Sequence, residues 1–282
     1  MRKILIIGKT SFIGVSLNKW LSLKYDTYCV TLIGAKNSEW RKIDLSKYEV
    51  VINVAGIAHI KAKKSLKPLF YYVNRDLAIE IGCSAKIAGV KQYIYFSSMN
   101  VYGDFVGKIT SDTIPAPYSF YGESKLQADK KLLSICSDNF RVLCIRPPVV
   151  YGKGCKGNFL KLLRYSRFLR IVPDYHNYKS VIHIDNLCEC IRLLIDKNYY
   201  GIIHPQNKDI LSTKEMIMQI RSISNKKTYQ IKIFNPIIKK LVKYSHAGRR
   251  IFGDDYYDTN LSTIPGIEYS IHNFTSSLKN IF

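Results

Sequence analysis

The sequence of 282 residues lacks an apolar run of about 18 residues, the length that a membrane-spanning helix needs. Lys, Gly or Asp interrupts each longer apolar stretch within a few residues. The apolar stretch that follows Met1 is too short for a secretion signal and ends at Gly8. The sequence therefore predicts no membrane span and a cytoplasmic protein, with 47% hydrophobic residues to form a large folded core.

Paired cysteines at metal-binding spacing are also missing. The seven cysteines are odd in number, and most of them fall inside predicted strands or helices. This distribution is typical of reduced, buried thiols. Cys188 and Cys190 stand close together, but no second pair follows at zinc spacing, so the sequence predicts no metal site.

Acidic residues are scarce: 21 Asp and Glu stand against 43 Lys and Arg, a net charge of +22. Such a chain favours an anionic partner, which could be nucleic acid, an anionic membrane face or a phosphorylated small molecule. The basic residues form no continuous run, and their densest clusters are residues 61–67 and 239–250. An AT-rich genome, which enriches Ile, Lys, Asn and Tyr, accounts for the charge better than any specific polyanion does. We expect no nucleic-acid partner and leave open a peripheral attraction to an anionic membrane.

A predicted strand, a glycine turn and a predicted helix open the chain. Residues 3–7 are a continuous aliphatic run, typical of a strand buried on both faces. Gly8 permits a tight turn, Gly14 lets the helix pack closely on the strand, and the amides of the helix N-terminus can face a pyrophosphate. Ser11 stands where a middle glycine is usual and narrows that approach, so an ordinary strand-to-helix turn is the alternative.

No acidic residue directly follows the second predicted strand, residues 28–33, where one would indicate NAD. Lys36 stands nearby instead, and a lysine there could pair with the 2′-phosphate of NADP. Residues 44–45 are predicted to close a short strand. The next buried strand ends at Ala55 and Gly56, whose small size would admit a cofactor.

Three side chains could together form a proton-transfer site. Tyr121 and Lys125 stand four apart in a predicted helix over residues 120–136, so they share one face, and a neighbouring cation favours the phenolate. Ser98 follows a predicted strand over residues 92–96, at the edge where parallel sheets bind ligands, and could bond a substrate carbonyl. Taken singly, a solvated Tyr and Lys pair and a turn serine are the alternatives.

Six motifs in this order resemble the extended short-chain dehydrogenase/reductase family, and in particular its nucleotide-sugar epimerases, dehydratases and 4-ketoreductases. The motifs are the glycine loop of residues 8–14, the dipeptide Asp44 and Leu45, residues 53–56, residues 97–103, the Tyr121 and Lys125 pair, and residues 146–152. Residues 151–163 and 178–187 are similar to a bacterial branch of surface-polysaccharide synthesis. Members of that branch reduce UDP-4-keto-6-deoxy-N-acetylglucosamine.

The resemblance implies an α/β fold with a doubly wound parallel sheet. A dinucleotide-binding Rossmann domain is expected over residues 1–154, to which residues 180–204 return. A smaller C-terminal α/β lobe over residues 155–282 is expected to bind the nucleotide sugar. The implied cofactor is NADP or NAD, the implied substrate is a UDP-sugar, and the implied assembly is a homodimer.

The resemblance also implies roles for single residues. Tyr121 would be the acid/base, Lys125 would hold the nicotinamide ribose and lower the pKa of Tyr121, and Ser98 would bond the sugar O4. Cofactor contacts are expected at Gly8, Ser11, Phe12, Ile13, Gly14, Lys36, Asp44, Leu45, Ala55, Gly56, Asn74, Tyr121 and Lys125. Substrate contacts are expected at Ser98, Asn100, Asn158, Lys179 and Arg249, and Lys179 stands where an arginine is often found.

The reaction implied by these roles is hydride exchange at C4 of the sugar. We favour reduction of a UDP-4-keto-6-deoxy-HexNAc, with a UDP-sugar 4-epimerase that holds NAD tightly as the alternative. Dehydration is disfavoured because Met99 and Asn100 replace the Asp-Glu pair that such enzymes carry. A catalytically silent NADP-binding or RNA-binding relative is the second alternative, although such proteins commonly lose the Ser98, Tyr121 and Lys125 set.

Overall fold

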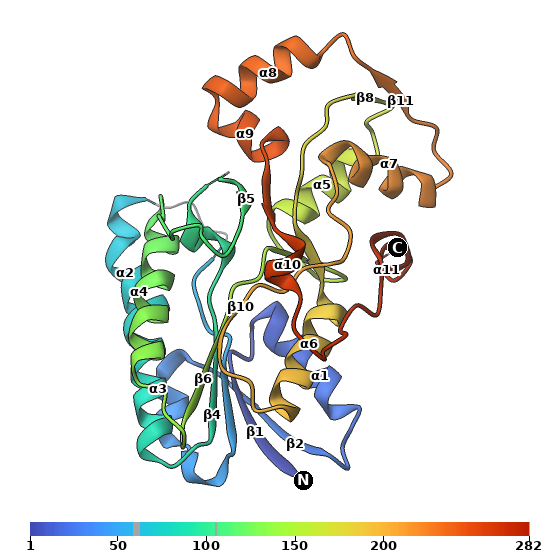
Figure 1. The fold of residues 1–282 in the computed structure, drawn as a ribbon. Helices are drawn as coiled ribbons and strands as arrows, with labels where there is room; N and C mark the ends of the chain where they lie inside the picture. Colours follow the sequence, from blue (N-terminus) through green and yellow to red (C-terminus); the bar gives the residue numbers. More distant parts are fainter. Residues whose placement is uncertain (59–62, 105, 282) are drawn as a thin grey trace.

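The computed structural model describes residues 1–58, 63–104 and 106–281, and a six-stranded parallel sheet forms its lower half in Figure 1. The strand order is β10-β6-β4-β3-β1-β2. The strands are β1 (Arg2–Ile7), β2 (Tyr28–Ile33), β3 (Val50–Asn53), β4 (Gln92–Phe96), β6 (Arg141–Ile145) and β10 (Gly201–Ile203). The order reverses between β1 and β3, which confirms the predicted doubly wound α/β fold and places the ligand crevice at their carboxyl ends.

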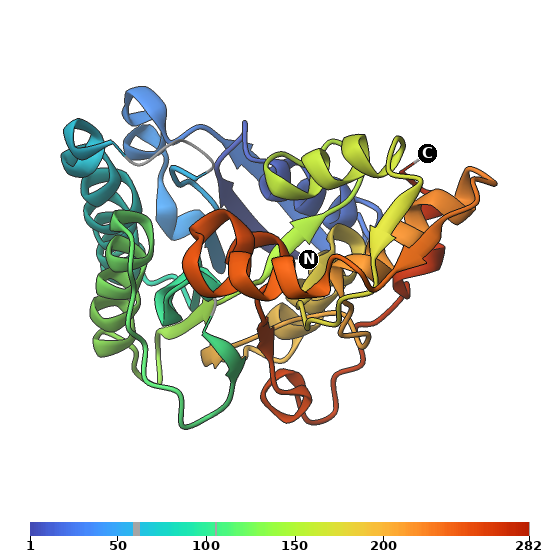
Figure 2. The same ribbon diagram turned by 90° about the horizontal axis from the view of Figure 1, so that it is seen from above.

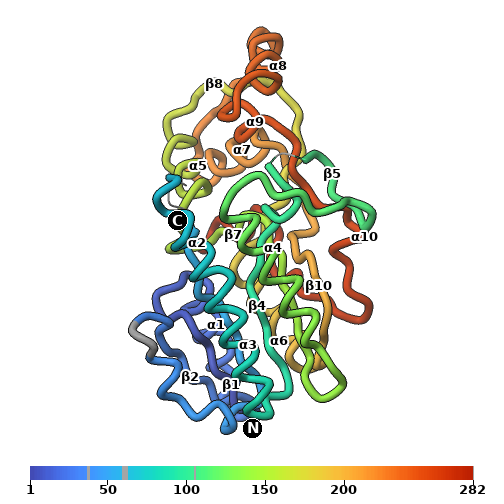
Figure 3. The backbone as a smooth tube through the Cα atoms, turned by 90° about the vertical axis from the view of Figure 1, so that its left-hand side faces the viewer, coloured from blue at the N-terminus to red at the C-terminus, as the bar shows by residue number. Residues whose placement is uncertain are grey.

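The sheet is buried on both faces because alternate side chains of each strand enter different apolar clusters. Ile4 and Ile6 pack with α1 (Phe12–Ser22) and α6 (Ile184–Asp196). Leu5 and Ile7 pack with the helices of the other face. These helices are α3 (Leu77–Ile87) and α4 (Phe120–Ser134), which Figure 3 shows side by side, and α2 (Lys67–Tyr71) precedes α3.

The short strand predicted to close at residues 44–45 is absent. Two 3₁₀ helices, η1 (Lys36–Lys42) and η2 (Leu45–Lys47), connect β2 to β3 instead. Asp44 caps η2, since its carboxylate accepts the Ser46 N–H at 3.1 Å. This local hydrogen bond competes with a strand, so the sheet ends at β2.

The upper part in Figure 1 holds most of the remaining helices together with short parallel strands. These strands are β7 (Val149–Tyr151) with β9 (Val181–His183), and β8 (Ile171–Pro173) with β11 (Tyr229–Ile231). The helices are α5 (Asn158–Ser166), α7 (Thr213–Ile223), α8 (Asn235–Tyr244) and α9 (His246–Phe252). Viewed from above in Figure 2, α8 and α9 lie between the α2 to α4 side and α5, over the middle of the molecule.

The C-terminal segment returns to the lower part of the molecule, where it packs on the sheet side. Strand β12 (Asp255–Tyr257) pairs with β5 (Gly107–Ile109), and α10 (Thr259–Ser262) follows. Ile264, Ile267 and Tyr269 then join the apolar cluster of the large sheet, because they are apolar and bury against α6 and β10. The last helix, α11 (Phe274–Lys279), packs with α5 and α7. No helix in the described ranges is long and apolar enough to cross a membrane.

Candidate active site

The glycine turn after β1 brings α1 unusually close to the sheet. Gly8 has φ +137°, and a Cβ there would lie 2.7 Å from Val54 Cγ2. A Cβ on Gly14 would lie 2.7 Å from the Gly8 carbonyl oxygen. Ser11 caps α1, since its Oγ accepts the Gly14 N–H at 3.4 Å. The turn therefore needs both glycines and brings the N-terminus of α1 to the crevice, an arrangement that fits a dinucleotide pyrophosphate.

Phe12 and Ile13 form the first turn of α1. Both side chains are partly buried and pack against apolar clusters, Phe12 against two of them. Only their backbone amides can therefore face a cofactor pyrophosphate.

An acidic side chain does lie at the end of β2, which corrects the expectation from the sequence. The carboxylate of Glu39 accepts the Gly34 N–H at 3.1 Å and pairs with Lys9 at 2.8 Å. The hydrogen bonds from Lys9 and then Gly34 hold the pKa of Glu39 below its usual value. Lys36 begins η1 and is exposed. No local sequence pattern marks Glu39, which lies five residues beyond Gly34 and reaches it by folding back.

Asn74 holds the loop after β3 through hydrogen bonds to its main chain. This buried side chain accepts the Ile57 N–H at 2.8 Å and donates to the Ile57 carbonyl at 3.2 Å. Asn74 can leave α-helical register because it lies in a π-helical turn, η4 (Tyr72–Asp76). A Cβ on Gly56 would lie 3.0 Å from Asn74 Oδ1 and 3.2 Å from Lys125 Nζ. Ala55 and Gly56 thus carry the loop to the predicted catalytic lysine.

Helix α4 presents Tyr121 to Ser98. Its first turn packs tightly on the chain after β4, since a Cβ on Gly122 would lie 2.3 Å from the Asn100 carbonyl oxygen. Ser98 Oγ donates to Asn100 Oδ1 at 3.0 Å. Burial raises the pKa of Tyr121, while its hydrogen bond with Ser98 lowers it. The lowering of this pKa by Lys125, which the resemblance implies, stays a prediction.

Lys125 is buried one turn further along α4. Its Nζ donates to the Phe96 carbonyl at 2.7 Å and lies 4.7 Å from the centre of the Tyr95 ring. Burial lowers the pKa of Lys125 to about 8, and the carboxylate of Asp129 opposes this lowering. Asp129 follows Lys125 by four residues, so Tyr121, Lys125 and Asp129 form one stripe on α4.

Asp129 anchors a buried polar network that the sequence analysis missed. Its Oδ2 accepts from Ser97 Oγ at 2.8 Å and from Arg146 Nε at 3.0 Å. Arg146 also donates to the Tyr102 hydroxyl at 2.8 Å, and that hydroxyl lies 2.7 Å from His204 Nε2. Burial raises the pKa of Asp129, and the Arg146 guanidinium lowers it. The four-residue spacing after Lys125 was the signal for this residue.

A family model agrees with this geometry. Residues 4–201 match the model of the NAD dependent epimerase/dehydratase family, which is more than half of the chain. The chain belongs to this family. Within the family it falls in the nucleotide-sugar epimerase and reductase branch, as the resemblance implied.

Two curated relatives and one solved structure are similar to this family member. UDP-glucose 4-epimerase from Vibrio cholerae is 30% identical over 258 residues, which cover 82% of this chain and 79% of the relative. N-acetyl-α-D-glucosaminyl-diphospho-ditrans,octacis-undecaprenol 4-epimerase from Escherichia coli O157:H7 is 26% identical over 247 residues, which cover 79% of this chain and 73% of the relative. The dTDP-4-dehydrorhamnose reductase from Bacillus anthracis in complex with NADP has the same fold, with a TM-score of 0.74, 17% identity, and 100% of this chain and 99% of that chain covered. The family to which the chain belongs is NAD dependent, which agrees with the predicted cofactor, NADP or NAD.

The family member's predicted substrate residues lie toward the upper part of the molecule. Asn100 Nδ2 donates to Asp104 Oδ1 at 3.4 Å, and Asp104 Oδ2 lies 3.2 Å from His246 Nε2 at the start of α9. Asn158 accepts from Arg250 Nη2 at 2.6 Å. The structure thus joins Asn158 to Arg250, which was not among the substrate residues expected from the sequence.

The other two predicted substrate residues have different settings. Arg249 donates to the Lys243 carbonyl at 3.2 Å and so caps the end of α8. Burial lowers the pKa of Lys179, and the carboxylates of Asp255 and Asp254 oppose this lowering. Their contact with a substrate stays a prediction, as do the other site assignments.

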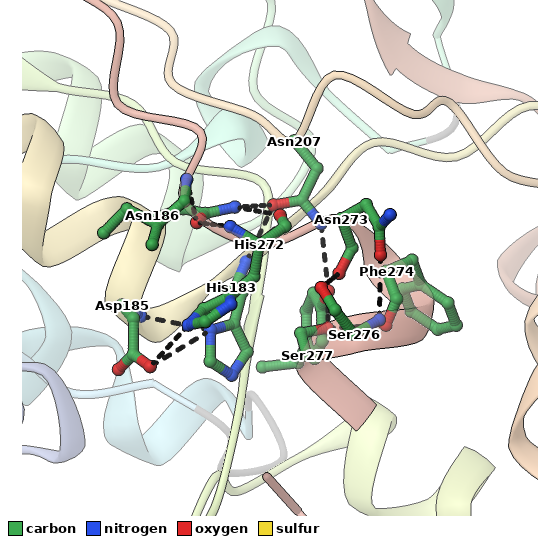
Figure 4. Close-up of polar contacts among 11 residues, drawn as sticks. His183, Asp185, Asn186, Asn207, His272, Asn273, Phe274, Ser276 and Ser277 are labelled. Carbon is green, nitrogen blue, oxygen red and sulfur yellow. Dashed lines mark hydrogen bonds and ion pairs between the residues drawn. The ribbon is translucent and has the colours of Figure 1, made fainter. Parts of the chain in front are cut away.

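His183, Asp185 and His272 form a group with the composition of a metal site (Figure 4). Their hydrogen bonds indicate a structural clamp. His183 Nδ1 accepts the Asp185 N–H at 3.3 Å and so caps α6. Asn186 bonds the main chain of His272 at 2.8 and 2.9 Å. Burial lowers the pKa of His183 to about 4, so its ring is neutral at pH 7. The clamp therefore ties the C-terminal segment to α6.

Proposed function

We propose that this protein exchanges a hydride at C4 of a diphosphate-linked sugar and works as a UDP-sugar 4-epimerase with NAD. The observation that carries the proposal is the meeting of Ser98, Tyr121 and Lys125 beside the loop of Gly56, above the glycine turn. NAD, when bound, supplies the hydride acceptor and donor. The carboxylate of Glu39 at the end of β2 supports NAD over NADP. A carboxylate can accept a hydrogen bond from the adenine-ribose 2′-hydroxyl of NAD, which is replaced by a phosphate in NADP.

The chain's own residues move the proton. Ser98 Oγ orients the sugar O4, and Tyr121 exchanges its proton with that oxygen. Oxidation of the alcohol needs the Tyr121 phenolate, which the Ser98 hydrogen bond favours, and return of the proton needs the phenol. The Lys125 ammonium places a positive charge beside Gly56. It can donate a hydrogen bond to a cofactor hydroxyl that binds next to Gly56.

Reduction of a UDP-4-keto-6-deoxy-HexNAc is the second candidate. It is favoured by the raised pKa of Tyr121, because reduction needs only the protonated phenol. Lys9 and Lys36 near the end of β2 would suit the 2′-phosphate of NADP. Reduction consumes one reduced cofactor for each sugar, whereas epimerisation leaves the cofactor unchanged overall.

The test incubates the purified protein with NAD and UDP-glucose or UDP-GlcNAc, and separately with NADPH and UDP-4-keto-6-deoxy-GlcNAc. The carrier is varied in a third arm with undecaprenyl-diphosphate GlcNAc, because the Escherichia coli relative is named for that compound. We expect NMR to show the C4 epimer with no net loss of NAD. Cofactor consumption by the keto sugar alone would establish the reductase, and no reaction in any arm would leave a silent cofactor-binding relative.

Tyr121→Phe is the matched control for chemistry. The variant should lose about 10²- to 10⁴-fold in kcat because the proton donor is gone. Its affinity for NAD should stay within about twofold, since the phenyl ring is kept. The proposal also includes a homodimer, which light scattering can test. It includes a peripheral attraction to an anionic membrane and no nucleic-acid partner.

A further inference from the structure

Helix α8 presents an apolar stripe to solvent. Ile237, Leu241 and Tyr244 stand at i, i+4 and i+7, and their exposed fractions are 57%, 44% and 74%. Phe234, at 43%, extends the stripe by one turn. The buried residue of α8 is Ile238, which lies at the edge of the stripe beside Phe234 and Leu241, where the helix meets the rest of the molecule. Spacing that normally marks a core face is therefore turned outward here.

The same segment is strongly basic. Residues 229–253 contain no Asp or Glu. Four exposed lysines accompany the stripe, namely Lys232, Lys239, Lys240 and Lys243. At 100° per residue, Lys240 and Lys243 lie next to Tyr244, at the edge of the apolar stripe that is opposite the buried Ile238. Positive charge therefore borders the stripe on its solvent side. An apolar stripe beside lysines is the pattern of helices that lie in a membrane interface.

The α8 and α9 pair is joined to the substrate side of the molecule. His246 of α9 contacts Asp104, which bonds Asn100 beside Ser98. Arg250 of α9 bonds Asn158. In Figure 1 α8 forms the upper end of the molecule, and the N-terminus and the amino ends of the strands lie at the opposite end. A surface that held α8 would therefore lie on the substrate side.

We propose that the α8 stripe docks this protein on an anionic phospholipid bilayer, with α8 in the plane of the headgroups. Phe234, Ile237, Leu241 and Tyr244 enter the boundary between headgroups and acyl chains, and the lysines contact lipid phosphates. A second copy is a poorer occupant because its own lysines and its +22 charge would repel the first copy. The proposal is independent of which sugar the active site takes.

The experiment measures cosedimentation of the full chain with vesicles of phosphatidylcholine alone and of phosphatidylcholine with phosphatidylglycerol. We expect binding to the phosphatidylglycerol vesicles, weakened by added salt. The apolar variant I237Q/L241Q should bind at least tenfold more weakly. The charge variant K239Q/K240Q/K243Q should bind about a hundredfold more weakly.

Each variant has a control of the same chemistry at the other end of the molecule. Ile87→Gln changes an 88% exposed residue at the end of α3. The control for charge is K24Q/K47Q/K91Q, three exposed lysines near the amino ends of β2, β3 and β4. Both controls should bind within about threefold of the unchanged protein, because their sites face away from the bilayer.

Three results would overturn the proposal. The unchanged protein could fail to bind phosphatidylglycerol vesicles, the α8 variants could bind as well as the controls, or light scattering could show a dimer that I237Q/L241Q dissociates. Thermal unfolding checks that the variants fold, since exposed side chains should change it little. Activity on a soluble UDP-sugar should persist in the α8 variants, which separates failure of docking from failure of the proposed reaction.

Discussion

At the scale of single residues, two buried charges on α4 decide which protons the site exchanges. Burial favours the neutral form of both Lys125 and Asp129, and each charge opposes neutralisation of the other. Lys125 keeps its proton at pH 7 by a narrow margin, because its pKa lies at about 8. Burial raises the pKa of Tyr121 away from this range. Lys125 is therefore the group in this set that changes charge just above neutral pH.

The pH profile of kcat/KM should show this titration. Since kcat/KM reports the free enzyme, activity that needs the Lys125 ammonium should fall as pH rises through about 8. In Lys125→Arg the descending limb should move to much higher pH, because the guanidinium keeps its proton. Initial rates measured from pH 6 to about pH 10 check both profiles. If the descending limb lies at the same pH in both proteins, the titration belongs to a group other than Lys125.

Asp129→Asn should move the limb in the opposite direction. Removal of the carboxylate takes away the charge that raises the pKa of Lys125, so the descending limb should fall below 8. The variant also leaves the buried Arg146 guanidinium uncompensated, which should cost about 3–5 kcal/mol of stability. The pH profile and urea unfolding measure the two effects.

Asp138→Asn is the matched control for that variant. Asp138 also pairs with an arginine, Arg141 at 3.3 Å, but its side chain is 96% exposed. Its loss should change stability by less than about 1 kcal/mol and leave the pH profile in place. An unmoved limb in Asp129→Asn would limit Asp129 to a structural role.

At the scale of elements, the sequence was informative wherever a period or a sheet edge decides the structure. The aliphatic run of residues 3–7 forms β1, and the four-residue spacing of Tyr121 and Lys125 follows from one helix period. Ser98 meets Tyr121 because ligand residues gather at the carboxyl edge of parallel strands. These features depend on neighbours in sequence or on a general rule of the fold.

Elements set by tertiary packing were not predictable in the same way. The 3₁₀ helix η1 replaces a strand because Trp40 is buried against the sheet and Glu39 bonds back to Gly34. Asp129 and Arg146 are 17 residues apart, and only the packing of α4 on β6 brings them together. No local pattern encodes such pairings, which is why the sequence analysis placed no acid at the end of β2.

The turn between β2 and η1 should set the choice of cofactor. Glu39→Gln removes the carboxylate that can accept ribose hydroxyls, so NAD affinity should fall about tenfold. NADP affinity should rise, because the negative charge that would repel the 2′-phosphate is lost and Lys9 loses its partner. Calorimetric titration of both cofactors measures the ratio. Glu49→Gln, at the amino end of β3 and paired with Lys91, is the control and should leave the ratio unchanged.

At the scale of the whole molecule, the C-terminal segment joins the two parts into one core. Ile264 and Ile267 belong to the cluster of the large sheet, and Phe274 and Leu278 belong to the cluster of α5 and α7. Phe12, on the first turn of α1, packs against both clusters. Opening the crevice between the parts would therefore disturb apolar contacts on either side of it.

This coupling predicts that the chain unfolds in one transition and that a cofactor bound at the glycine turn stabilises both parts together. Saturation with NAD at about 100 times its Kd should add about 2.7 kcal/mol and shift a single calorimetric peak. Phe274→Ala should remove about 3–5 kcal/mol from that same transition, because the ring is 1% exposed. Ile271→Ala, in the same segment but 46% exposed, should change it much less. Two peaks, of which NAD moves one, would show that the lobes unfold independently despite their shared segment.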